Sequence, residues 1–475
     1  MGAQTKAAKA SPSPSPSPNK QSTTLKYLFT LDSPSNKCTT LINNPTLHHH
    51  LSRKPDLDPI TAELITKISF CNFAFTFTDP FESPTQQDLK RQKLCEILDY
   101  LRATSKDKHP YPDSVLSAFF SMFSSNIFRS LPPPPPTARE APDPDQEPEL
   151  MPIEPMWTHL QLVYDILLKI VVSPQIEPKA VRHHLNEAFV LKLLNLFKAE
   201  DPRERESLKN VFHRIYSRFT FYRSFMRKSM SDVFLHTVFE GERHPGIGDL
   251  LEIWGSIING FSLPLKDEHR LFLMRVLVPL HKPKGLPIYH RQLAYCVSQF
   301  VIKEPGLGGS LIKGILKYWP LTNCQKEVLL IGEIEELVEH TDPGELRKLG
   351  SSLCSQVAKC MNSWNSQVAE RALYVWNNEA FVNVVSKTME CAWPTMVDAL
   401  EKNLKWHWSK TVRQLTMSVK TMLEEMEPVL YMECLEGSGK RAAMANEEDM
   451  RRKEKWERLE IAAANSLQPC ICVSQ

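Results

Sequence analysis

Amphipathic helical segments recur at nearly constant spacing from residue 157 onward. They begin near residues 157, 201, 247, 289, 324, 367 and 409, which are separated by 44, 46, 42, 35, 43 and 42 residues. Each unit holds two such segments, separated by a Pro, Gly or Asp break. A period of roughly 40 residues with two helices per unit is typical of HEAT-like repeats. We therefore predict an all-α fold, a HEAT-like α-solenoid.

Composition divides the 475-residue chain into three parts. Residues 1–58 are rich in Ser and Pro and cannot bury enough apolar surface to offset their chain entropy, so we predict a disordered or irregular segment. Residues 59–436 form the predicted repeat domain. It is interrupted by a proline-rich acidic loop at 132–155, whose five successive prolines exclude a helix. Residues 437–475 are predicted to form a charged C-terminal helix and a tail.

Charge and cysteine usage narrow the function classes. A net charge of +2 gives no general reason to expect nucleic acid or an anionic membrane as the main partner. Eleven cysteines without a C-x-x-C pair fit a reducing compartment. We expect a cytoplasmic protein, with the nucleus as a second compartment. No run of 18 apolar residues predicts a membrane-spanning helix.

Catalytic motifs are missing from the sequence. It contains no Walker-type G-x-x-x-x-G-K-[ST], no H-E-x-x-H, no G-x-S-x-G and no signature of a dinuclear-metal phosphatase. The run His48–His50 is interpreted as loop, because metal binding needs ligands held in a fixed geometry. We predict that the chain is not an enzyme and needs no cofactor or metal.

The stretch from residue 201 to residue 270 has the pattern of a binding surface. Two apolar stripes at helical spacing predict its core-facing residues, namely Leu208, Val211, Phe212, Ile215 and Phe219, and then Ile247, Leu250, Leu251, Trp254, Ile258 and Phe261. Outside the stripes lie charged and polar side chains beside two further isoleucines: His213, Arg214, Tyr216, Arg223, Glu252, Ile253, Ile257, Lys266 and His269. An apolar floor with a basic rim would suit an extended peptide that carries a hydrophobic residue and a carboxylate.

Two alternatives apply to this stretch. Ile253 and Ile257 could simply pack on a neighbouring repeat, as is common in solenoids. The run Arg218–Lys228 interleaves basic and aromatic residues, which could stack on RNA bases. Core aromatics with a basic solvent face explain the same spacing, and the nearly neutral chain favours that interpretation.

Several long strings carry a resemblance to a known family. They are HLQLVYDILLKI, EDPRERESLKNVFHRIYSRF, LLEIWGSIINGFSLPLKDEHR, LVPLHKPKGLPIYHRQLAYCVSQF, LKYWP and QVAERALYVWNNE. With them the chain resembles the B-prime regulatory subunits of protein phosphatase 2A, from about Tyr111 to Glu436. Its many prolines and its Ser-Pro tail are similar to those of a plant member.

The resemblance implies a solenoid that joins a scaffold subunit and a serine/threonine phosphatase catalytic subunit. It also implies recruitment of substrate proteins through Leu-x-x-Ile-x-Glu peptides. On this basis His213 and Arg214 would meet the polar and acidic parts of the peptide, and Arg223 would seat its Leu end. Tyr216, Ile253 and Ile257 would make apolar contacts, Lys266 and His269 would hold the Glu carboxylate, and Glu252 would be an acidic member of the groove.

Both the loop and the C-terminus depart from that family pattern. The proline run at 132–136 makes the loop longer than usual. The chain ends Cys472-Val473-Ser474-Gln475, which resembles a prenylation box, and Cys470 could carry a second acyl anchor. An inert tail is the alternative, so membrane binding is expected only if the C-terminus is lipidated. The competing function class is an α-solenoid adaptor for nuclear transport or RNA binding; otherwise no nucleic-acid partner is expected.

Overall fold

The computed structural model describes residues 58–75, 77, 84–104, 110–131, 156–241, 243–387 and 389–466. The chain divides into two units, Met1–Asp58 and Pro59–Gln475, and every described helix belongs to the second. The predictions for residues 1–57, for the proline-rich loop at 132–155, and for Cys470 and Cys472 lie outside the described residues.

The described residues form 18 α-helices and no strand, so the predicted all-α fold is confirmed. The N-terminal helices are α1 (Pro59–Phe70), α2 (Pro84–Ala103) and α3 (Asp113–Ile127). One set of helices continues with α4 (Trp157–Val172), α6 (Pro202–Arg218), α8 (Ile247–Asn259), α10 (Leu286–Lys303), α12 (Cys324–His340), α14 (Ser366–Tyr374) and α17 (Lys410–Met426). These seven helices begin within one turn of the predicted repeat starts.

A second set of helices alternates with the first along the chain. It comprises α5 (Glu187–Asn195), α7 (Arg223–Glu240), α9 (Asp267–Phe272), α11 (Gly308–Lys317), α13 (Pro343–Met361), α15 (Glu379–Ser386), α16 (Met389–Trp406) and α18 (Pro428–Ser466). After α9 the chain continues as a π-helical turn, η7 (Leu273–Leu277), and a 3-10 turn, η8 (Val278–His281).

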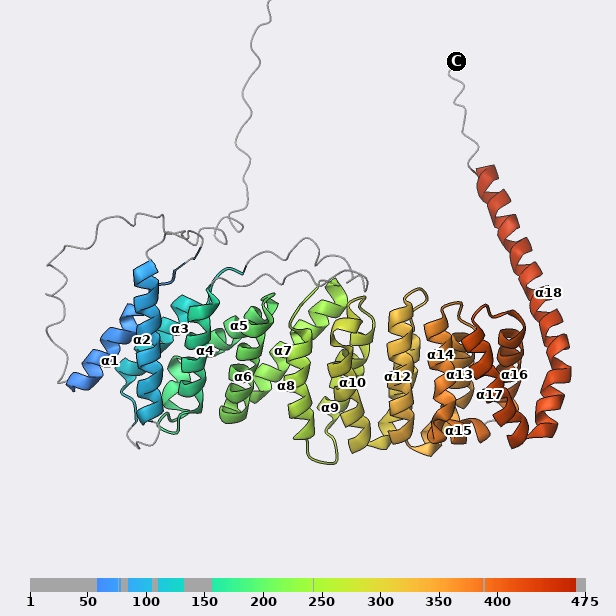
Figure 1. The fold of residues 1–475 in the computed structure, drawn as a ribbon, viewed down its shortest axis with the longest axis horizontal. Helices are drawn as coiled ribbons and strands as arrows, with labels where there is room; N and C mark the ends of the chain where they lie inside the picture. Colours follow the sequence, from blue (N-terminus) through green and yellow to red (C-terminus); the bar gives the residue numbers. More distant parts are fainter. Residues whose placement is uncertain are drawn as a thin grey trace, which may run out of the picture. The chain divides into compact units, whose positions relative to one another are not determined.

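Contacts between the helices define two layers. The first layer contains α2, α4, α6, α8, α10, α12, α14 and α17, and each of these helices packs on the next. In the second layer α5 packs on α7, α7 on η7 and η8, and η8 on α11, followed by α13, α16 and α18. Figure 1 shows the helices of this unit following one another in chain order. Each repeat alone is too thin to bury its apolar face, so stacking creates one continuous core.

Polar caps set the helix starts that break the sequence into repeats. The side chain of Asp201 accepts a hydrogen bond from the Arg203 amide at 2.9 Å at the start of α6. Asn365 accepts from the Gln367 amide at 3.0 Å at the start of α14. Each cap satisfies a backbone donor that the first turn leaves unpaired. These short Asp and Asn signals position the first-layer helices.

The last helix differs from the predicted domain division. Helix α18 is continuous from Pro428 to Ser466, so the change predicted at residue 437 lies inside a helix that begins nine residues earlier. Its first turns are held in the core by Tyr431 and Cys434, which are buried, whereas residues 443–464 are exposed. Figure 1 shows α18 extending past its neighbours. Across the described ranges no helix is long and apolar enough to cross a membrane.

Candidate peptide-binding surface

Two ion pairs set the register between α6 and α8. Arg205 Nε lies 3.0 Å from Asp249 Oδ2, and Lys209 Nζ lies 2.5 Å from Glu252 Oε2. The residue numbers rise together on both helices, so α6 and α8 run parallel. Because each residue advances a helix by about 1.5 Å, the C-terminal halves of α6 and α8 also face each other.

Packing confirms the two predicted core stripes. Every stripe residue is buried except Phe261, which is half-buried. Ile253 and Ile257 are also in the core, with 2% and 6% of their surface exposed. Both therefore belong to the hydrophobic core, which favours the alternative that they pack within the solenoid. A ligand could touch only the small exposed edge of each side chain.

The end of α6 and the start of α7 are joined around Tyr216. Arg223 donates to the Tyr216 carbonyl oxygen at 3.1 Å and to the Ser217 carbonyl oxygen at 2.9 Å, and its guanidinium lies 5.5 Å from the Tyr216 ring centroid. One turn later, Arg227 Nη1 donates to the Tyr216 hydroxyl at 3.2 Å. Two arginines are thereby fixed beside the C-terminal end of α6.

Helix α9 meets this group through Glu268. Arg227 Nη2 lies 3.9 Å from Glu268 Oε1, which in turn lies 3.4 Å from His269 Nε2. The His269 ring stacks on Phe261, with the ring centroids 3.7 Å apart and the planes nearly parallel. Burial lowers the pKa of His269, Glu268 opposes that shift, and the charges of Arg227 and Lys266 reinforce it. His269 therefore favours the neutral imidazole when no further anion is present.

Three cations at this surface have no carboxylate partner among the described residues. Arg214 and Lys266 are exposed, and Arg223 is half-buried and bonded only to carbonyl oxygens and the Tyr216 ring. We call Arg214, Arg223 and Lys266 the open cation set. His213, also half-buried, precedes Arg214, and its pKa is lowered by burial and by the Arg214 charge.

Glu252 lies apart from the open cation set. Its carboxylate is held by Lys209 at 2.5 Å and by Gln292 Nε2 at 3.3 Å. Burial alone would raise its pKa, but the hydrogen bonds from Lys209 and Gln292 lower it. The structure thus brings Tyr216, Arg223 and His269 together through shared contacts, and it places Glu252 at the level of Lys209, two turns earlier on α6.

Sequence reasoning missed three residues that organise this surface: Lys209, Arg227 and Glu268. Arg227 could have been found, because it follows Arg223 by four residues and so shares its helix face. Lys209 and Glu268 could not, since their roles depend on carboxylates or cations from other helices.

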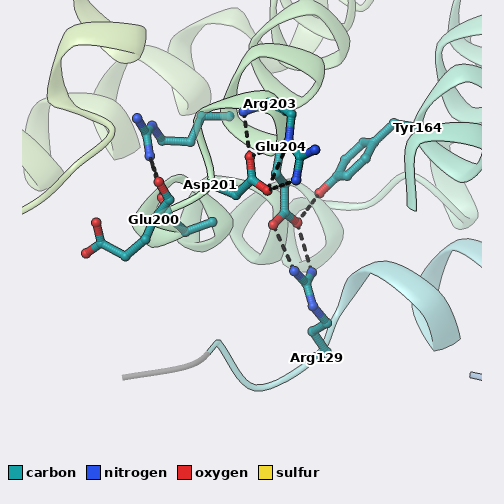
Figure 2. Close-up of polar contacts among 8 residues, drawn as sticks. Arg129, Tyr164, Glu200, Asp201, Arg203 and Glu204 are labelled. Carbon is teal, nitrogen blue, oxygen red and sulfur yellow. Dashed lines mark hydrogen bonds and ion pairs between the residues drawn. The ribbon is translucent and has the colours of Figure 1, made fainter. Parts of the chain in front are cut away.

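A buried ionic network holds the start of α6 (Figure 2). Glu204 is 1% exposed, and both of its carboxylate oxygens accept from Arg129 at 2.8 Å. The Tyr164 hydroxyl donates to the same carboxylate at 2.9 Å, and burial, followed by the Glu204 charge, raises the Tyr164 pKa. Arg129 follows α3 and Tyr164 lies on α4, so the network ties three helices together. It fixes the helix that carries Arg214 and Tyr216.

The fold and this surface define a class of protein: an α-solenoid with an exposed, basic face and no group of side chains suited to hold a metal among the described residues. Residues 51–463 match the model of the family described as protein phosphatase 2A regulatory B subunit (B56 family). The chain belongs to this family, which confirms the resemblance stated from the sequence.

Curated plant proteins agree with the family assignment. The chain is 45% identical over 402 residues to the B' beta isoform of the 57 kDa regulatory subunit of serine/threonine protein phosphatase 2A from Arabidopsis thaliana, a match that covers 84% of this chain and 80% of that protein. It is 43% identical over 409 residues to the B' kappa isoform from Oryza sativa subsp. japonica, covering 85% and 78%. The chain is a non-catalytic phosphatase regulator, and the prediction that it is not an enzyme is confirmed.

Proposed function

We propose that the chain joins the scaffold and catalytic subunits of protein phosphatase 2A and selects substrates by binding Leu-x-x-Ile-x-Glu peptides along the C-terminal half of α6. The family and the names of its relatives support the assembly. The peptide's acidic end would lie on the open cation set, and its apolar residues would lie on Tyr216 and on the exposed edges of Ile253 and Ile257.

The observation that carries the peptide proposal is a contrast along α6. Arg203, Arg205 and Lys209, in its first half, are each paired with a carboxylate of the chain. Arg214, in its second half, and Arg223, just after the helix, have no such partner among the described residues. Unpaired cations held beside an aromatic ring favour an acidic ligand, because charge-assisted hydrogen bonds orient carboxylates.

The size of the surface fits a short peptide. Lys209, which is engaged with Glu252, limits the surface at one end, and the Tyr216–Arg227–Glu268 contacts limit it at the other. Seven residues of helix separate Lys209 from Tyr216, or about 10 Å. An extended strand covers that distance with three or four residues, so this stretch would hold part of the six-residue motif, and the rest would continue over the open cations toward α7 and α9.

Assembly and peptide binding need separate tests. For assembly, the full chain is mixed with purified scaffold and catalytic subunits, and we expect one co-eluting complex in gel filtration. For the groove, fluorescence anisotropy compares a labelled peptide ending in Glu with the same peptide ending in Gln. Losing the carboxylate should weaken binding by about 1–3 kcal/mol, as expected for a charge-assisted contact.

The two tests fail in different ways. A chain that elutes alone contradicts the assembly proposal. Equal affinity for the Glu and Gln peptides contradicts the groove proposal, even if the complex forms. Salt-sensitive RNA binding with no complex formed would instead favour the adaptor class.

A further inference from the structure

Three tryptophans are exposed on the connections between repeats in the C-terminal half. Trp364 is 72% exposed, Trp406 is 65% exposed and Trp408 is 61% exposed. Trp364 lies between α13 and α14, and the other two lie where α16 ends and α17 begins. Tryptophan is highly buried on average, so three exposed indoles on adjacent connections are unusual and indicate a contact surface.

Hydrogen bonds hold the two connections side by side. Trp408 Nε1 donates to the Trp364 carbonyl oxygen at 2.9 Å, and Asn403 Nδ2 donates to the Met361 carbonyl oxygen at 2.7 Å. His407 is buried beneath them, with its ring centroid 6.5 Å from that of Trp364 and 5.9 Å from that of Trp408. Trp364 and Trp408 therefore share one patch above His407, and Trp406 ends α16 two residues before Trp408.

The preceding connection adds another apolar residue to the same edge. Leu321, between α11 and α12, is 94% exposed. Leu316, at the end of α11, and Trp319, in that connection, line a small cavity together with Gln356 and Cys360 near the end of α13. Since α13 leads directly into Trp364, the Leu321 connection lies next to the tryptophans. We call Leu321, Trp364, Trp406 and Trp408 the tryptophan edge.

The charged residues nearest in sequence to the three tryptophans are basic. Lys402, Lys405 and Lys410 are exposed and have no ion pair within the described ranges, and Lys405 Nζ lies 5.2 Å from the Trp406 ring centroid. No Asp or Glu occurs at residues 359–369 or 402–420. Glu401 precedes the second stretch, but Lys420 and Tyr431 engage its carboxylate at 2.7 and 2.8 Å. A net charge of +2 for the whole chain conceals this local excess.

We infer that the tryptophan edge docks this protein on the surface of an anionic lipid bilayer. Indole rings favour the headgroup region, where the ring is apolar and the N–H stays hydrated, and lysines beside them attract acidic lipids. The indoles are mostly exposed, so they project into solvent and do not line a groove that would hold a peptide side chain. The inference is independent of the proposed peptide binding, and it requires no lipid on Cys472.

Charge complementarity favours a bilayer over a protein partner at this edge. Long side chains of lysine can extend toward headgroups while the rings insert, and a flat, fluid surface accommodates projecting rings without matching pockets. Elsewhere on the molecule Trp456 is also exposed, at 62%, but it lies on α18 between Glu454, Lys455, Glu457 and Arg458. That residue has the same exposure, but glutamates are interspersed among the basic residues of 451–460, so it provides a control in mixed charge.

The test uses the full chain produced in bacteria, which do not prenylate proteins. Co-sedimentation is measured with phosphatidylcholine vesicles and with vesicles containing about 30% phosphatidylserine. We expect binding to the acidic vesicles, a loss of about tenfold or more in the variant W364A/W406A/W408A, and no change in W456A. The variant K405E/K410E should lose about fivefold or more per lysine, with the indoles intact. Circular dichroism and thermal melts check that each variant is folded.

Three results would overturn the inference. The first is that the unmodified chain does not bind acidic vesicles. The second is that W364A/W406A/W408A binds as well as the parent or as W456A. The third is that W364A/W406A/W408A no longer co-elutes with the phosphatase scaffold or catalytic subunit in gel filtration, while the parent binds no vesicles. That result would make the tryptophan edge a protein interface.

Discussion

Two groups of charged residues, in neighbouring parts of the solenoid, are built in opposite ways. The first, the buried carboxylate cluster, is Glu333 on α12 with His281 at the end of η8 and His290 on α10. Glu333 is 2% exposed, and its two oxygens lie 3.0 Å from His281 Nε2 and 2.9 Å from His290 Nε2. The second group is the open cation set, whose charges have no carboxylate partner among the described residues.

The buried cluster is satisfied within the chain. His281 Nδ1 lies 2.8 Å from the Val278 carbonyl oxygen, and its Nε2 faces Glu333, so both nitrogens must donate and the ring is an imidazolium. Burial opposes that charge, but Glu333 raises the pKa of His281 above its ordinary value. Burial would likewise raise the pKa of Glu333, yet the two histidines lower it to about 2. Closed pairing of this kind holds repeats together, whereas open cations are available to a ligand.

The largest expected effect concerns the buried carboxylate cluster. Glu333→Gln keeps the shape of the side chain but leaves the His281 imidazolium buried without its counter-charge. Breaking one partner of a buried pair costs about 3–5 kcal/mol in the free energy of unfolding. Urea denaturation should show this loss, and Glu336→Gln, an exposed change on the same helix, should show almost none. Equal free energies of unfolding for the two variants would mean that the Glu333 charge does not stabilise the fold.

The next largest effect concerns the open cation set. Arg214→Ala removes an exposed guanidinium that has no partner in the described chain, so the free energy of unfolding should change little. Affinity for the Leu-x-x-Ile-x-Glu peptide should fall by about 1–3 kcal/mol, measured by anisotropy. Arg347→Ala, which removes an exposed arginine of α13, is the matched control. A folded Arg214→Ala protein that binds the peptide normally would contradict the role given to the open cation set.

The dependence of stability on pH tests the buried carboxylate cluster further. The His281 pKa is raised, so its contribution is complete below its ordinary value of 6.5 and is lost as pH rises through the folded pKa. The Glu333 pKa is lowered, so its contribution is complete above 4.5 and is lost as pH falls toward about 2. The difference in the free energy of unfolding between the parent and Glu333→Gln should be largest between pH 4.5 and pH 6.5. It should narrow by about 1–2 kcal/mol at alkaline pH. A gap that stays constant as the pH rises would mean that His281 is neutral.

The repeat pattern predicted the fold well because helical periodicity and capping are local signals. The first-layer helices begin close to the predicted residues, and Asp201, Asn365 and Ser409 cap them. The C-terminal boundary was less accurate, since a change in surface charge at residue 437 does not end a helix whose backbone can continue. Only three-dimensional packing could show that Ile253 and Ile257 belong to the core, because a helix in a solenoid is covered on more than one side.

The candidate site shows the same division between local and long-range information. Helix position places Arg214 outside the core stripe, and Lys266 is a positive charge nearby in sequence; both are exposed. Glu252 was predicted as an acidic member of the groove, but its bonds to Lys209 and Gln292 come from two other helices. Such partners lie about 40 residues away in sequence, so the periodicity of a single helix does not reveal them.

A smaller effect is expected when peptide affinity is measured against pH. The pKa values of His213 and His269 are both lowered by burial and by neighbouring cations, so both rings favour the neutral form in the free protein. A bound carboxylate would raise these pKa values, and binding should therefore tighten as the pH falls from about 8 to about 6, by roughly threefold to tenfold. His269→Gln keeps a hydrogen-bond donor that does not titrate, so it should reduce this dependence. Affinity that is independent of pH would place the carboxylate away from both histidines.

The smallest effect concerns Glu252, which is exposed like Arg214 and Lys266 but paired like the buried carboxylate cluster. Its side chain is 43% exposed and that of Lys209 is 17% exposed, so solvent screens the pair and Glu252→Gln should change the free energy of unfolding by less than about 1 kcal/mol. Lys209 lies two helical turns before Tyr216, or about 10 Å, so peptide affinity should rise only slightly when the negative charge is removed. Anisotropy with Glu252→Gln measures this directly. A loss of about fivefold or more would mean that Glu252 contacts the peptide, and that the groove extends past Lys209 toward the start of α6.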